Sequence, residues 1–149
     1  MPTEKKVSRP WYLAATHFLT SGFAIPFVIS LVWGFLSAAL LPEGGMTAIV
    51  LGIIVSAIAV WLGVLYSANY IRKKYELPDP SKIVRLSTIY MAVSYLLYDA
   101  FIFAGAFVAL STESEATGGV SIAIVLGVLQ TIVNVSIFYL VSRSKFVRS

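Results

Sequence analysis

Residues 46–70 read MTAIVLGIIVSAIAVWLGVLYSANY and contain no Asp, Glu, Lys or Arg. A helix needs about 20 mostly apolar residues to cross roughly 30 Å of hydrocarbon. Backbone polar groups inside lipid have to be satisfied within the segment itself, and a helix does this. The stretch therefore predicts a transmembrane helix.

Three further runs have the same character, at 11–41, 86–110 and 118–141. Asp99 is the only formal charge inside any of the four runs. The connections 42–45 and 111–117 are short, which forces the helices they join to lie antiparallel. We therefore expect an all-α fold: an integral membrane bundle of four transmembrane helices, built from two antiparallel hairpins as a single domain over 1–149.

The composition supports a lipid environment. Hydrophobic residues make up 58% of the chain and charged residues 12%, against roughly 45–50% and about 25% in soluble domains. A soluble domain of this size buries only about 68–70% of its unfolded surface, so the apolar excess would face water. The chain has no Cys and one His, His17, which excludes thiolate sites, disulfides and multi-histidine zinc sites. We expect no cofactor, no metal and no enzymatic chemistry.

The basic residues all fall on one side of the predicted bundle. They are Lys5, Lys6, Arg9, Arg72, Lys73, Lys74, Lys82, Arg85, Arg143, Lys145 and Arg148. The opposite loops carry only Glu43, Glu113 and Glu115. By the positive-inside rule, both termini and the loop 71–85 are predicted to be cytoplasmic, with the protein in the cell (inner) membrane. The same charges can attract anionic lipid headgroups, whereas their arrangement does not predict nucleic-acid binding.

The loop 71–85 holds a helix start signal. Asp79 is followed by Pro80, which is the pattern of an N-cap residue and a first helical position. We expect the third helix to begin there, ahead of its apolar run, which starts at Leu86.

Small residues recur on the first two helices. The stripe on the first comprises Gly22, Pro26, Ser30, Gly34 and Ala38, and the stripe on the second comprises Ala48, Gly52 and Ser56. In an antiparallel hairpin, two residues lie at equal depth when their numbers add to the same constant; we call this the depth rule. Three pairs across the stripes add to 86: Ala38 with Ala48, Gly34 with Gly52, and Ser30 with Ser56. We expect the stripes to face each other, because small residues let membrane helices approach closely. Pro26 predicts a kink, because it cannot donate a backbone hydrogen bond.

Asp99 is the main candidate for function, since an ionised carboxylate near the middle of a span costs about 2.5–3.5 kcal/mol on insertion scales. By the same depth rule it lies level with Gln130, and we expect the two to face each other. The candidate intramembrane polar site comprises Asp99, Tyr95, Tyr98, Ser94, Gln130 and Asn134. Two interpretations stay open: a proton- or cation-binding site with Asp99 as carrier, or a protonated carboxyl that ties the third helix to the fourth.

Two functional hypotheses follow. The first is an accessory, assembly or interaction subunit that packs against other membrane helices, in a homo-oligomer or a hetero-complex, through its small-residue faces. The alternative is a small homo-oligomeric ion- or proton-linked transporter or channel with Asp99 at mid-membrane. The first is favoured because the loops are short and because the first two helices bring little polar lining to mid-depth. His17, predicted level with Asn69, is interpreted as a hydrogen-bonded packing residue.

Overall fold

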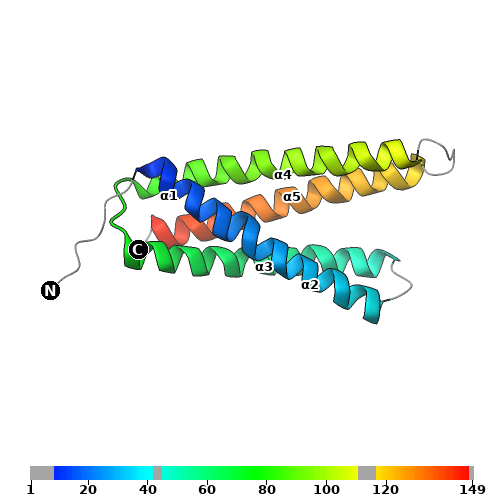
Figure 1. Ribbon diagram of the computed structural model, residues 1–149, viewed down its shortest axis with the longest axis horizontal. Helices are drawn as coiled ribbons and strands as arrows, with labels where there is room; N and C mark the ends of the chain where they lie inside the picture. The colour runs from blue at the N-terminus through cyan, green and yellow to red at the C-terminus, as the bar shows by residue number, and fades with distance from the viewer. Residues whose placement is uncertain (1–8, 42–44, 111–116, 148–149) are drawn as a thin grey trace.

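The computed structural model describes residues 9–41, 45–110 and 117–147, with side chains described for 9–41, 45–105 and 121–147. Every regular element in this part of the chain is helical. The elements are α1 (Pro10–His17), the π-helix η1 (Phe18–Ala24), α2 (Ile25–Leu40), α3 (Gly45–Lys74), α4 (Pro80–Leu110) and α5 (Thr117–Phe146). α1, η1 and α2 follow one another without a break, and together we call them helix one (Figure 1).

Four stretches of helix are long and apolar enough to cross a membrane. Within the described residues they are Pro10–Leu40, Gly45–Lys74, Pro80–Gly105 and Ser121–Phe146. The prediction of an all-helical chain with four such helices is therefore confirmed. At the end of the bundle where α1 starts and α5 ends, each helix extends past its apolar run. For example, α3 continues through the basic residues Arg72, Lys73 and Lys74.

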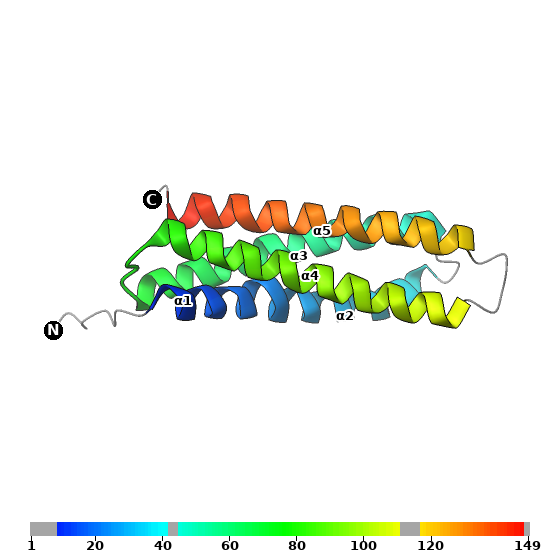
Figure 2. The ribbon, with the colours of Figure 1, turned by 90° about the horizontal axis from the view of Figure 1, so that it is seen from above.

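The helices gather at one end of the bundle and separate at the other. The start of α1 and the end of α5 lie at the same end of the bundle, which we call the terminal end, and from there the α2 and α3 pair diverges from the α4 and α5 pair (Figure 1). Viewed from above, the helices remain roughly aligned along the long axis (Figure 2). We call the opposite end the distal end.

The buried apolar side chains are concentrated where the helices lie closest together. One buried cluster lies at the terminal end and contains Leu13, Ala14, Ala68, Ile71, Ile83, Val84 and Phe146. A second lies nearer the middle and contains Val60, Val64, Met91 and Phe138. Beyond it, Pro26 is the only buried residue of α2. The core thus occupies the terminal half of the bundle, and the distal half leaves apolar side chains exposed.

The start of α4 follows the sequence signal. α4 begins at Pro80, and the Asp79 Oδ1 accepts a hydrogen bond from the backbone N–H of Lys82 at 3.0 Å. This bond satisfies one of the helix's unpaired N-terminal donors. The predicted N-cap at Asp79 is confirmed.

The first helix is irregular ahead of Pro26. The expected disturbance takes the form of the seven-residue π-helix η1, at whose end the N–H of Ile25 donates to the carbonyl of Thr20. Pro26 lacks an N–H and therefore removes one donor from the next turn. A hydrogen bond that spans five residues lets the chain pass this point while remaining helical.

One expected pair of the small-residue stripes, Gly34 with Gly52, does not come into contact. The nearest atom to a Cβ built on Gly52 is Nε1 of Trp33, at 3.4 Å, and Gly63 lies against the backbone of Ser21. A Cβ on Gly34 would meet no atom within 4 Å. The residue numbers of the contacting pairs add to 85 (Trp33 and Gly52) and 84 (Ser21 and Gly63), close to the expected 86. The predicted depth is therefore nearly right, but helix one turns a different face toward α3. Large Trp33, rather than Gly34, fills the space beside Gly52.

Candidate functional site

A cavity of about 290 Å³ lies at the middle of the bundle, where the two helix pairs begin to separate. Residues from η1, α2, α3, α4 and α5 line it. They are Phe18, Gly22, Phe23, Pro26, Phe27, Ser30, Ser56, Ser94, Tyr95, Tyr98 and Gln130. Phe18 and Tyr95 also pack against the buried cluster around Phe138, which therefore closes the cavity on its terminal side.

The lining contains five aromatic rings and four small or medium polar side chains, and no charged residue. Its open side is aromatic: Phe23 and Phe27 stack with ring centroids 5.8 Å apart, and both are more than half exposed. Tyr98 is 59% exposed on the α4 side. The cavity therefore opens between helix one and α4 and is not sealed within the bundle.

Asn134 and Ser56 form a buried polar contact beside this cavity. The Asn134 Nδ2 donates to the Ser56 Oγ at 2.7 Å, and this bond joins α5 to α3 across the two helix pairs. Asn134 is fully buried, and its Oδ1 has no partner among the described atoms. Exchanging the amide oxygen and nitrogen would leave the other atom unpaired, so one end of the amide keeps free hydrogen-bonding capacity in either orientation.

Asp99 lies at the contact between α4 and α5. Its Oδ2 accepts a hydrogen bond from the Thr131 hydroxyl at 2.6 Å. The expected partner, Gln130, lines the cavity instead. The residue numbers of Asp99 and Thr131 add to 230. Those of Phe103 and Gly127, whose contact lies one turn further along the same two helices, also add to 230. The register is thus shifted by one residue from the expected sum of 229. Successive residues of a helix point about 100° apart, so a shift of one residue brings Thr131 rather than Gln130 to the Asp99 carboxyl group.

The predicted polar set divides into three positions. Ser94, Tyr95, Tyr98 and Gln130 share the cavity wall. Asn134 lies behind it, within hydrogen-bonding reach of Tyr95, and Asp99 lies one helical turn beyond Tyr95. From the predicted packing stripe, Gly22, Pro26, Ser30 and Ser56 also line the cavity, whereas Gly34 and Ala38 are exposed.

A second polar centre surrounds His17, closer to the terminal end. His17 is fully buried, and its Nδ1 is hydrogen-bonded to the Ser67 hydroxyl while its Nε2 lies 3.0 Å from the Ser142 hydroxyl. Ser21 donates to the His17 carbonyl. The rings of Phe138 and Phe146 pack against the imidazole at centroid distances of 5.0 and 5.1 Å. One side chain thereby joins α1, η1, α3 and α5.

His17 is a hydrogen-bonded packing residue, as predicted, but its partners differ from the expected one. Ser67, not the exposed Asn69, is level with it. The pair sum is 84, like that of Ser21 and Gly63. A π-helical segment uses more residues per turn, which lowers the sum for pairs on its terminal side. The depth rule with a tolerance of two residues would have found Ser67; nothing local in the sequence indicated Ser142.

Within the described part of the chain, no group of three or more His, Cys, Asp or Glu residues could hold a metal ion. No protein-family model matches the sequence, and no curated protein or solved structure is significantly similar to it.

Proposed function

We propose that this chain is a non-enzymatic multi-pass membrane protein that associates with other transmembrane helices, as an accessory or assembly subunit. In this proposal both termini and the basic connection between α3 and α4 are cytoplasmic. The four apolar helices and the position of the described basic residues, at or next to the terminal end, support it. Lipid covers the exposed apolar side chains that no partner covers.

One observation carries the proposal: the distal part of the small-residue stripe on α2 has no partner among the described side chains. Gly34 and Ala38 are exposed, and the space where a Cβ of Gly34 would lie is empty. α2 packs mainly against α3. In lipid, helices associate by close van der Waals contact, for which small residues four positions apart provide the surface. A stripe that no described side chain covers is available to a second helix.

Gly34→Leu is expected to abolish this association while leaving the monomer folded, because the leucine side chain would hold a partner helix away. The matched control is Gly105→Leu on α4, since a Cβ at Gly105 also meets nothing within 4 Å. Native mass spectrometry of protein gently extracted from its membrane would report the stoichiometry and the identity of any foreign subunit. A wild-type protein that is purely monomeric, or a Gly34→Leu variant that still assembles, would refute the proposal.

The second candidate, a small homo-oligomeric ion- or proton-linked transporter, gains support from the cavity. Helices one and two were expected to bring little polar lining to mid-depth. Instead Ser30 and Ser56 line the cavity together with side chains of α4 and α5. Both helix pairs therefore contribute polar groups to one site, as a solute path would require.

On this second candidate, Asp99→Asn is expected to abolish flux in proteoliposomes under a proton, Na⁺ or K⁺ gradient. The amide oxygen can still accept the hydrogen bond from Thr131, so the bundle stays folded. A pH-sensitive dye inside the vesicles reports proton movement, and ion-sensitive dyes report the other two cations. Flux that survives the substitution would leave Asp99 with only the structural role of joining α4 to α5.

A further inference from the structure

We propose that the mid-bundle cavity binds a monovalent organic cation with apolar substituents, such as an aryl or alkyl ammonium. This inference goes beyond the proposed association through α2 and does not depend on it. It combines the aromatic lining, the position of the acidic and amide oxygens, the distribution of cations in the chain, and the size and opening of the cavity.

The lining has the composition of an aromatic cage. Phe18, Phe23 and Phe27 approach from helix one, and Tyr95 and Tyr98 approach from α4. The face of an aromatic ring attracts a cation within about 6 Å of its centroid, most strongly where water is excluded. Quaternary ammonium groups are recognised in this way, because their charge is spread over apolar methyl groups that can contact the rings.

An acidic side chain and a buried amide with one unpaired atom lie near the cage, and the described basic side chains are remote from it. Asp99 follows Tyr98 in sequence and lies one helical turn from Tyr95, with its Oδ2 hydrogen-bonded to the Thr131 hydroxyl. The fully buried Asn134 retains an unpaired amide atom behind Tyr95. All the Lys and Arg side chains that the structure describes lie at or next to the terminal end. Among the described residues, a cation in the cavity therefore competes with no basic side chain.

The size of the cavity distinguishes an organic cation from a bare metal ion. A volume of about 290 Å³ is close to the lower limit of roughly 300 Å³ for pockets that hold small organic molecules. A hard metal cation prefers several oxygen ligands, commonly carboxylates, at short distances. The lining contains no carboxylate, and most of its surface residues are aromatic or apolar. The cavity therefore fits a bulky ligand with a diffuse positive charge better than a bare metal ion.

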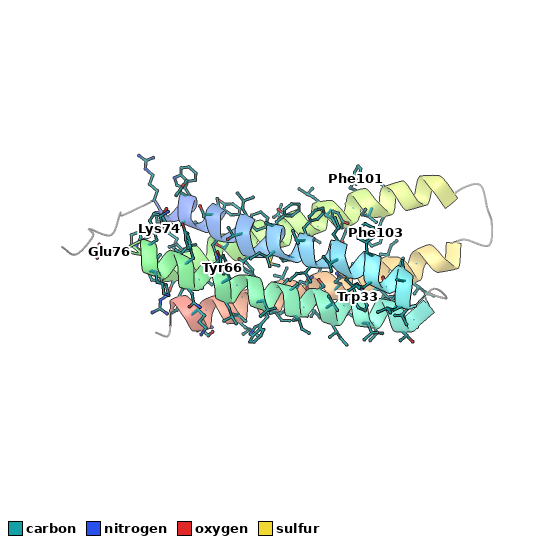
Figure 3. The ribbon with its side chains drawn as sticks, turned by 60° about the horizontal axis from the view of Figure 1, so that its bottom comes forward. Trp33, Tyr66, Lys74, Glu76, Phe101 and Phe103 are labelled. Atoms are coloured by element: carbon teal, nitrogen blue, oxygen red, sulfur yellow. The ribbon has the colours of Figure 1, made fainter. Side chains whose placement is uncertain are left out.

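The opening suits a ligand that arrives through the bilayer. The stacked pair Phe23 and Phe27 forms one side of the mouth, and Tyr98 forms the other. α2 and α4 diverge on the distal side of this mouth (Figure 1). Phe101 on α4 is 78% exposed and points away from the bundle, so it leaves the entrance clear (Figure 3). A cation with apolar substituents can therefore reach the cage sideways.

The test uses the purified full chain in lipid nanodiscs with labelled phenyltrimethylammonium as the probe. Equilibrium dialysis against empty nanodiscs separates binding from partitioning into lipid. We expect saturable binding at one site per chain. Unlabelled tert-butylbenzene, which has the same shape but no charge, should compete at least about tenfold less well. Equal competition by this neutral molecule would overturn the proposal, as would the absence of saturable binding.

A pair of tyrosine variants locates the bound probe. Tyr98→Ala is expected to weaken binding about threefold to tenfold through loss of one ring, while Tyr98→Phe keeps the ring and the affinity. Tyr66→Ala is the matched control, because Tyr66 is 64% exposed, similar to Tyr98, and lies outside the lining. Both residues are exposed, so neither variant removes a buried contact. Equal effects of Tyr98→Ala and Tyr66→Ala would contradict binding in this cavity.

Discussion

Replacing His17 by Ala is expected to lower the free energy of unfolding by about 3–5 kcal/mol. The imidazole is fully buried between Phe138 and Phe146, so its removal leaves a cavity in the packed half of the bundle. The hydroxyls of Ser67 and Ser142 also lose their partner. Reversible unfolding in mixed dodecylmaltoside and SDS micelles, followed by circular dichroism, would measure the change.

Thr16→Ala provides the control for this prediction. Thr16 precedes His17 and is half-buried, and its hydroxyl donates only to the carbonyl of Tyr12 in the same helix. Its loss is expected to change stability by less than about 0.5 kcal/mol. If His17→Ala shifted the unfolding curve no more than Thr16→Ala, the buried junction of three helices would not be a source of stability.

Gly63→Leu is expected to have a comparable effect by the opposite mechanism, overpacking. A Cβ at this position would lie 3.0 Å from the carbonyl oxygen of Ser21 and 3.2 Å from its Cα. These are backbone atoms, which cannot move aside as the end of a side chain can. Overpacking typically costs about 1–3 kcal/mol. Because a leucine here also has to push η1 away from α3, we expect a loss of about 3 kcal/mol or more.

Gly34→Leu is the matched comparison for Gly63→Leu, because the same substitution then occurs on a helix face with open space around it. Its unfolding free energy in detergent should stay within about 0.5 kcal/mol of the wild-type value. The same micelle titration measures both variants. Equal stabilities of the two variants would contradict the close approach of η1 and α3.

The two sensitive positions belong to one region of the structure. Ser21 contacts His17 through its hydroxyl and meets Gly63 through its backbone. Here the π-helix η1 lies against α3, immediately on the terminal side of the cavity. This region anchors the closed half of the bundle, from which the two helix pairs diverge.

Local signals in the sequence were enough to predict the elements. Uninterrupted apolar runs indicated four helices, because length and hydropathy in a window do not depend on what packs against it. The cap at Asp79 and the start at Pro80 were equally local. The depth rule placed residues to within two positions, since a short connection and a constant rise per residue limit the possible register.

The partners of individual side chains could not be predicted in this way. A one-residue difference in register replaced Gln130 by Thr131 beside Asp99, because it rotates the facing side of α5 by about 100°. The choice of Trp33 rather than Gly34 to fill the space at Gly52 depends on the shapes of both helices.

The sequence by itself determined an all-helical chain with four membrane-compatible helices, their approximate ends and the clustering of basic residues, because hydropathy, capping and charge act locally. Only the tertiary structure decided that His17 would join three serines, that Ser56 would meet Asn134, and that part of the packing stripe would line a cavity. These contacts join residues between 50 and 125 positions apart, apart from the local one between Ser21 and His17. They depend on how whole helices rotate and diverge, which no short stretch of sequence specifies.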